Sequence, residues 1–307
     1  MEFLTKPQQE AINNIATIKS NDKSKSKGTF PKRKFTAKDI KKLAKNRHLV
    51  KPTILSLLKT AKVIREHDTT KSYKTKITQP EFELLDKFIK DTLQMDSWGV
   101  CEISEIEIFK GMGIPYKNIL VMSRHMDTKF FVTKELPNMN CMLEVMKVYG
   151  DTGVACLKTT ELLRNIGVGA IPNHSLGGNL DYSRAGEKAN LGFVGKSGML
   201  ITPSSGSCNR LSIVYISIEN LNEFLVNEED FSWGTKFCDK CKTCVKTCPH
   251  SAIYEENKID DNGHIEYISN EKCNSGFASY GCAICIACCP FTKTAYNKIK
   301  SSFMKNL

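Results

Sequence analysis

Nine cysteines lie between residues 238 and 289 of this chain, and their spacing indicates iron–sulfur chemistry. The first run is Cys238-x2-Cys241-x2-Cys244-x3-Cys248 followed by Pro249, and the second is Cys273-x8-Cys282-x2-Cys285-x3-Cys289 followed by Pro290. The first run has the ferredoxin spacing, in which three thiolates bind one [4Fe-4S] cluster and the fourth binds a neighbouring cluster. Because the second run repeats the x2, x3, Pro ending, the sequence predicts two [4Fe-4S] clusters.

Two-cluster ferredoxins exchange one ligand between the two cysteine runs. In that arrangement one cluster is held by Cys238, Cys241, Cys244 and Cys289, and the other by Cys248, Cys273, Cys282 and Cys285. Cys288 remains an alternative to Cys289, since adjacent cysteines rarely both reach one cluster. Zinc prefers two CxxC pairs, so zinc and disulfides are the less favoured explanations of this many cysteines.

Length and composition are those of a soluble globular protein. The 307 residues are enough for two domains, and the apolar fraction of 41% is ordinary for a globular chain. No run of about 18 apolar residues occurs, and the first residues do not form a secretory signal. The sequence therefore predicts a protein without a membrane span, located in the cytoplasm, where thiols stay reduced.

The net charge of +11 belongs to one segment. Residues 1–80 contain 20 Lys and Arg against 6 Asp and Glu, whereas the remaining residues contain 24 against 27. The Lys- and Ser-rich residues 18–34 are typical of a solvated or partly disordered arm. Binding of RNA or an acidic partner is an open alternative, although few aromatic side chains are present there to stack on bases.

Hydrophobic periodicity predicts the elements that position these cysteines. We expect two short helices over residues 36–65, split near Pro52, and a further helix over 81–93. The clearest helix spans 151–166, with Asp151 or Thr152 as its cap and Gly167 as its end. Strands are expected at 119–122, 169–171 and 211–218. The polar loop 172–179 follows the second of these strands and has the composition of a binding loop.

Three motifs in the same order resemble those of the cobalamin-dependent reductive dehalogenases. Residues 189–203, ANLGFVGKSGMLITP, are similar to the AGLGE-x-GRNGLLITP stretch of that family, with Asn190 in place of Gly and Phe193 in place of Glu. The two cysteine runs, with the Phe237 that precedes the first, are the other two motifs. The resemblance covers about residues 115–295 and extends, more distantly, to the epoxyqueuosine reductases.

The resemblance implies an α+β fold, in which a nitroreductase-like cobalamin-binding core is followed by a ferredoxin-like domain with two [4Fe-4S] clusters. We place a basic helical or partly disordered segment at residues 1–75, the core at 76–228 and the ferredoxin-like domain at 229–307. The implied substrate is an organohalide, and the implied electron donor is an external low-potential carrier such as a ferredoxin or flavodoxin.

The same resemblance assigns catalytic roles. Tyr149, expected just before the helix 151–166, would donate a proton to the substrate carbon, and Arg210 would stabilise the phenolate that remains. Ser175 stands where the dehalogenases often have Asn. The cofactor contacts that we assign are Asn173, His174, Gly192, Gly195, Lys196 and Ser197.

Two other functions remain open. An epoxyqueuosine reductase-like enzyme acting on tRNA would match Gly195-Lys196 and the basic segment, but the only candidate for its catalytic aspartate is Asp181, which lies close to Gly192. A nucleic-acid partner is expected only under this alternative. The third alternative is a non-catalytic two-cluster electron-transfer protein, in which Tyr149 and Arg210 would have no chemical role.

Overall fold

A four-stranded antiparallel sheet forms the centre of the computed structural model, which describes residues 2–28, 35–132, 136–225, 229–277 and 281–305. Its strand order is β2-β4-β8-β5. The bounds of these strands are β2 Ser97–Glu102, β4 Asn118–His125, β8 Asn209–Ile216 and β5 Ala170–Asn173. The three strands expected from the sequence are thereby confirmed, with ends that differ from the expected ones by one to three residues.

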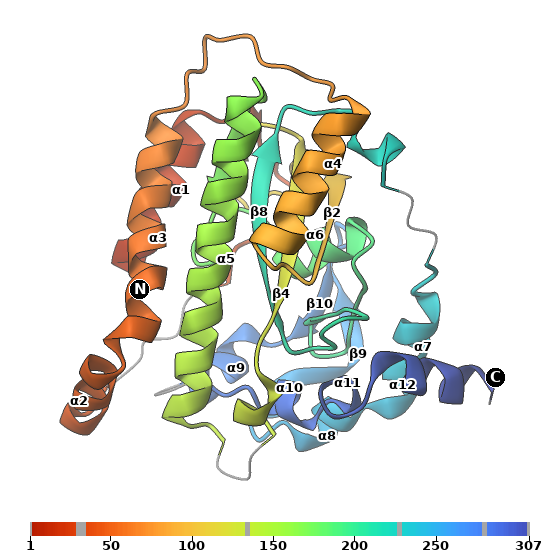
Figure 1. Cartoon of the computed structure of the whole chain (residues 1–307). Coiled ribbons are helices and arrows are strands. Elements are labelled where there is room, and N and C mark those ends of the chain that lie inside the picture. The colour runs from red at the N-terminus through yellow and green to blue at the C-terminus, as the bar shows by residue number, and fades with distance from the viewer. Residues whose placement is uncertain (1, 29–34, 133–135, 226–228, 278–280, 306–307) are drawn as a thin grey trace.

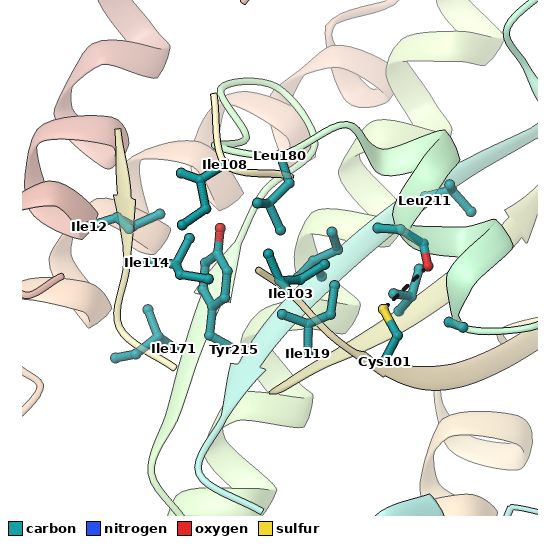
Figure 2. Packing of buried hydrophobic residues seen from close by; sticks show 14 of the residues in the cluster. Ile12, Cys101, Ile103, Ile108, Ile114, Ile119, Ile171, Leu180, Leu211 and Tyr215 are labelled. Carbon is teal, nitrogen blue, oxygen red and sulfur yellow. Dashed lines mark hydrogen bonds between the residues drawn. The ribbon is translucent and has the colours of Figure 1, made fainter. Parts of the chain in front are cut away.

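Both faces of the sheet are buried. Successive side chains of a strand point to opposite faces, and consecutive residues of β8 belong to two different apolar clusters. On β8, Ile213 and Tyr215 belong to one apolar cluster, and Val214 and Ile216 belong to the other. Figure 2 shows Tyr215 enclosed by isoleucine and leucine side chains of the first cluster. The helices α1 (Glu2–Asn14) and α6 (Tyr182–Lys188) cover that face, whereas α4 (Gln79–Lys87) and α5 (Met139–Asn165) cover the opposite one.

Helix α5 is longer than the sequence predicted. It contains 27 residues, and its N-cap is Asn138, whose side chain accepts a hydrogen bond from the Cys141 N–H. The predicted caps Asp151 and Thr152 lie inside the helix, so this expectation was wrong. Gly150 and Gly153 do not interrupt the helix, because they lie where α3 (Arg47–Arg65) packs closely against it.

The helices of residues 36–65 divide at a different place from the one predicted. α2 (Ala37–Lys45) begins with a capping box between Thr36 and Asp39, and the break before α3 falls at Asn46. Pro52 lies within α3, in its second turn, and packs against Gly150 of α5. A Cβ added to Gly150 would lie 2.9 Å from Pro52 Cβ. A proline near the beginning of a helix removes only one backbone hydrogen bond, and packing on α5 offsets that loss.

The N-terminal segment packs onto the core. β1 (Ile18–Lys19) pairs with β3 (Gly113–Ile114), and the Lys110 N–H donates to the Lys25 carbonyl. The described part of 18–34 is therefore attached to the core and does not form the solvated arm that we expected, while residues 29–34 lie outside the described residues. The boundary between 1–75 and 76–228 stays a prediction.

The remaining elements of the first 225 residues are short. They are the π-helix η1 (Phe88–Thr92), the 3-10 helices η2 (Glu105–Glu107), η3 (Thr128–Phe130) and η4 (Leu221–Glu223), and the strands β6 (Phe193–Val194) and β7 (Leu200–Ile201). Helix α4 and η1 together confirm the helix expected over 81–93. β6 and β7 pair as a small antiparallel hairpin over the glycine-rich stretch.

The cysteine-rich elements gather at one end of α5 and β4 (Figure 1). They are α7 (Ser232–Cys241), α8 (Thr243–Thr247), β9 (Ile253–Ile259), β10 (Ile265–Ile268), α9 (Asn270–Gly276), α10 (Ile284–Cys288), α11 (Pro290–Lys293) and α12 (Tyr296–Met304). The fold is thus mixed α/β, and the ferredoxin-like nature of residues 229–307 stays a prediction. No helix within the described ranges is both long and apolar enough to cross a bilayer.

We expect Gly153→Ala to destabilise the protein by about 1–3 kcal/mol, because overpacking a close contact forces the neighbouring groups apart. A Cβ at this position would lie 2.4 Å from Ser56 Oγ and 2.5 Å from His174 Cδ2. Thermal unfolding followed by circular dichroism measures the effect. Val154→Ala is the matched control, since Val154 on the same helix is partly exposed and should change stability by less than about 0.5 kcal/mol.

Candidate active site

A cavity of about 360 Å³ lies where the N-terminal half of α5 meets the cysteine-rich elements. We call it the central cavity, and its walls include Tyr149 of α5, Arg210 of β8 and Ser197. Three methionines, Met142, Met146 and Met199, give it an apolar surface. It is also lined by four of the predicted iron ligands, Cys248, Cys273, Cys282 and Cys285, which we call the inner thiol site. The fold thus brings two proposed catalytic side chains and one predicted cluster site to the same space.

Tyr149 and Arg210 contact each other across the cavity wall. The Arg210 guanidinium carbon lies 5.2 Å from the centre of the Tyr149 ring, within the range of a cation–π interaction. Tyr149 lies within α5, not in front of a helix as we expected. The Arg210 side chain donates to the Asn209 carbonyl, and no carboxylate of the described residues forms a salt bridge with it. Its positive charge therefore faces the cavity without a counter-charge.

A smaller cavity of about 170 Å³ adjoins this pair. It shares Tyr149, Met199 and Arg210 with the central cavity, and it is also lined by Ser175 and Tyr182. The Ser175 hydroxyl donates to the Leu211 carbonyl, so its proton is engaged and its oxygen can only accept from a ligand. Ser175 is therefore placed beside the Tyr149–Arg210 pair, as its predicted role requires.

Asn173 and His174 are buried behind the cavities and line neither of them. Asn173 accepts from Gln8 Nε2 at 2.9 Å and donates to the Tyr215 hydroxyl at 2.6 Å. Neither side chain therefore lines a cavity beside Tyr149, and the cofactor contacts assigned to them stay a prediction. The Gln8 side chain also accepts a hydrogen bond from the His174 N–H. The sequence did not predict these contacts with α1, because nothing local marks a glutamine 165 residues earlier.

His174 supports Tyr149 from the protein interior. Its ring centre lies 6.4 Å from that of Tyr149, and Nδ1 accepts from the Leu176 N–H at 3.1 Å. Burial lowers the pKa of His174 to about 3, although the Tyr149 backbone acts in the opposite direction. The imidazole is therefore neutral, and it contributes shape and packing to the site instead of a proton.

The other four predicted ligands line a separate small cavity of about 20 Å³. This outer thiol site consists of Cys238, Cys241, Cys244 and Cys289. Cys288 is not part of its lining, since its thiol points to the Cys285 carbonyl at 3.6 Å. The cysteines are thus partitioned as in the exchanged arrangement, with Cys289 at the outer site.

The buried thiols of the outer site need a positive charge beside them in order to ionise. Burial raises the pKa of Cys238 and of Cys244 to about 12, so these sulfurs would be protonated without a compensating positive charge. Iron ions supply such charge to thiolate ligands. Within the described ranges, no group of three or more His, Cys, Asp or Glu side chains is arranged to hold a single metal ion, and the two clusters stay a prediction from the cysteine spacing.

The β6–β7 hairpin connects the two sites. Lys196 lines the outer thiol site, with only 4% of its side chain exposed, and pairs with Asp239 at 3.0 Å. The next residue, Ser197, lines the central cavity. A Cβ on Gly195 would lie 3.5 Å from Cys238 Sγ, and one on Gly192 would lie 2.0 Å from the Ile201 carbonyl oxygen. The two glycines therefore permit close packing, whereas Lys196 and Ser197 reach the two sites.

The chain is similar in sequence to two groups of reductases, although no protein-family model matches it. A tetrachloroethene reductive dehalogenase of Sulfurospirillum multivorans is 30% identical over 145 residues, which are 43% of this chain and 27% of that protein. One of Desulfitobacterium hafniense is 28% identical over 200 residues, 60% of this chain and 34% of that protein. An epoxyqueuosine reductase of Francisella cf. novicida (strain Fx1) is 33% identical over 118 residues, 36% of this chain and 31% of that protein. The chain thus spans about a third or less of each relative.

The fold agrees with these relatives. A solved structure titled as the catabolic reductive dehalogenase NpRdhA, N-terminally tagged, in complex with 3-bromo-4-hydroxybenzoic acid, superposes with a TM-score of 0.62 and 15% sequence identity. The superposition covers 98% of this chain and 38% of that chain. At this identity the likeness shows a shared fold, and the reaction must be argued from the site.

The partition of the thiols predicts that Cys289→Ser lowers the iron content and that Cys288→Ser does not. Removing a cluster ligand should cost up to about four of about eight iron atoms per chain, the content of one of two cubane clusters. Iron analysis and electron paramagnetic resonance of anaerobically reconstituted protein provide the measurement. Iron loss in Cys288→Ser but not in Cys289→Ser would reverse the assignment.

Proposed function

We propose that this chain is a cobalamin- and iron–sulfur-dependent oxidoreductase of the reductive dehalogenase type, which replaces the halogen of an organohalide by hydrogen. The observation that carries the proposal is the central cavity. There Tyr149, Arg210 and the inner thiol site face one space, so a proton donor, a cation and a predicted source of electrons act on the same ligand. The relatives that are reductive dehalogenases agree with this reaction.

The residues around the central cavity fit a corrinoid. Its wall is apolar, with methionines and Leu176, as the faces of a large macrocycle require, and methionine side chains adapt to irregular ligands. Ser197 and Arg210 provide polar groups at its edge. The residues that would hold the cofactor are therefore Met142, Met146, Leu176, Ser197 and Met199.

Reductive dehalogenation needs electrons and a proton at the same carbon. When bound, the corrinoid supplies a low-potential cobalt for reduction of the carbon–halogen bond, and the clusters supply the electrons singly. The Tyr149 hydroxyl donates the proton to the substrate carbon. Arg210 stabilises the phenolate that remains, because its charge lies beside the ring and has no salt-bridge partner among the described residues.

The cavity wall around this chemistry is largely apolar. Methionine side chains of α5 pack with Tyr149, and α5 itself packs closely on α3. A low-dielectric site strengthens the interaction between Arg210 and a developing negative charge, on the tyrosine or on the departing halide. The Ser175 oxygen can accept a hydrogen bond from a polar substituent of the substrate in the adjoining cavity.

An epoxyqueuosine reductase-like function is the alternative, and one relative of 33% identity favours it. Its candidate acid, Asp181, caps α6 by accepting from the Ser183 and Arg184 N–H groups. Asp181 lines a different cavity, of about 330 Å³, together with Arg184 and Lys188. Because Asp181 does not line the space that contains Tyr149 and the inner thiol site, the geometry supports dehalogenation better.

One preparation distinguishes these functions. Protein reconstituted anaerobically with iron, sulfide and cobalamin is examined by metal analysis and visible spectroscopy, and is then assayed with tetrachloroethene, 3-bromo-4-hydroxybenzoic acid and an epoxyqueuosine-modified tRNA stem-loop. We expect both cofactors to bind and halide to be released from an organohalide. Turnover of the tRNA alone would support the alternative, and clusters without bound cobalamin or turnover would indicate a non-catalytic electron carrier.

Tyr149→Phe should lower the dehalogenation rate by at least about 100-fold, since general-acid catalysis contributes about 10²–10⁴-fold. The cobalamin spectrum and iron content should stay unchanged, because the hydroxyl is the only group removed. Halide release under single-turnover conditions measures the rate. Tyr254→Phe is the control, as Tyr254 lies on β9 outside the central cavity. Full activity of Tyr149→Phe would exclude this tyrosine as the proton donor.

A further inference from the structure

We propose that the basic surface formed by α7, α8, α11 and α12 around the outer thiol site is the docking surface for an acidic one-electron carrier protein. The inference rests on the proposed function, because it requires a cluster at the outer thiol site. It adds to that function the place where electrons enter the molecule. The carrier is a flavodoxin- or ferredoxin-like protein with a negatively charged surface.

The order of the two thiol sites determines where electrons must enter. The inner thiol site lines the central cavity, whereas the outer one is lined by residues of α7, α8, α11 and the β6–β7 hairpin and does not contribute to that cavity. An electron that travels toward Tyr149 and the substrate therefore passes the outer site first. All eight predicted ligands are partly buried, so a docked protein can approach the outer thiols without a change in the fold.

Charge is divided unequally between the elements of the cysteine-rich region. Residues 232–247, which form α7 and α8, contain four lysines and one aspartate. Residues 284–305, which form α10 to α12, contain four lysines and no acidic residue. By contrast, residues 253–276, which form β9, β10 and α9, contain six acidic residues and two lysines. The outer site is thus bordered by the basic elements.

Most of these lysines have no acidic partner. Lys242 pairs with Glu255 and Glu256, and Lys300 pairs with Glu229. The remaining lysines are exposed and form no salt bridge with a described residue; they are Lys236, Lys240, Lys246, Lys293, Lys298 and Lys305. Uncompensated charges of one sign attract a partner of opposite sign and orient it during diffusion.

Two lysines tie this charge to the outer site. Lys240 lies on α7 directly before Cys241, with its amino group 5.2 Å from the Phe303 ring centre of α12. Lys293 ends α11, the short helix whose Pro290 and Phe291 line the outer thiol site. A carrier held by these lysines would lie against the thiol-bearing helices. Nucleic acid also binds basic surfaces, but its binding would not explain why the lysines lie beside a predicted electron acceptor.

The transfer is a balanced one-electron step. The reduced carrier loses one electron and returns to its one-electron-oxidised form, and the oxidised cluster at the outer site gains that electron. No bond is formed or broken and no proton is required. The step can therefore be observed in cluster-loaded protein without cobalamin or substrate.

The test combines three charge reversals, Lys240→Glu, Lys246→Glu and Lys293→Glu, in the cluster-loaded chain. The second-order rate of cluster reduction by flavodoxin hydroquinone, followed by stopped-flow bleaching, should fall at least about 10-fold at low salt. Its salt dependence should weaken or reverse. Reduction by the methyl viologen radical cation, which is small and positive, should not slow down. Lys51→Glu, Lys59→Glu and Lys62→Glu on α3 make the same charge change at a distance and should have little effect.

Each contrary outcome overturns the proposal. An unchanged flavodoxin rate, or an equal fall in the α3 variant, would show that the basic surface does not guide the carrier. An equal fall with methyl viologen would show that the lysines act on the cluster and not on docking. Weakened tRNA binding with an intact flavodoxin rate would assign the surface to nucleic acid. Iron analysis of every variant precedes the kinetics, and lysine-to-glutamine variants provide a milder second set. Absence of iron from the native chain would refute the proposed function itself.

Discussion

The close contact between α3 and α5 fixes the site on which the proposed chemistry depends. A Cβ on Gly150 would lie 2.9 Å from Pro52, and one on Gly153 would lie 2.4 Å from Ser56 Oγ, so the two helices could not approach as they do with larger residues. Tyr149 directly precedes the first of these glycines. Because this close packing positions the backbone of α5 beside Tyr149, it also sets the direction in which the Tyr149 side chain leaves the helix. The same contact explains why α5 continues through two glycines, which usually weaken a helix.

Much of this arrangement could be predicted from the sequence, because its signals are local. The cysteine spacing defines two runs of four thiols, and the structure places them around two cavities with Cys248 and Cys289 exchanged between the runs, as the ferredoxin arrangement predicts. The strands were found because apolar runs bounded by polar residues are short-range patterns. The pairing of Tyr149 with Arg210 was implied by the resemblance to the reductive dehalogenases, through the position of Arg210 after the LITP stretch, and the two side chains lie in contact.

The expectations that were wrong concern long-range packing. The start of α5 was predicted 12 residues too late, since Asp151 and Thr152 have the side chains of helix caps and the packing of α3 against Gly150 is not a local signal. The cofactor contacts of His174 and Asn173 were assigned because their loop is polar, and they stay a prediction. In the structure the Asn173 side chain is bonded to Gln8 of α1, 165 residues away, and to the Tyr215 hydroxyl, whereas His174 Nε2 is buried with no hydrogen-bond partner among the described residues. A buried polar group needs a partner, but the sequence does not say whether that partner is a ligand or another element of the chain.

The β6–β7 hairpin gives the two thiol sites different electrostatic surroundings. Lys196 places a buried cation at the outer site, with only the half-exposed Asp239 to balance it, whereas the inner site faces the unpaired Arg210 across the central cavity. A nearby cation stabilises the more negative, reduced state of a cluster, and a low dielectric strengthens the effect. Because Lys196 and Ser197 are consecutive, a shift of the hairpin would alter both sites together. The β6–β7 hairpin thus connects the predicted electron path to the substrate cavity. Its close packing requires glycine at position 192.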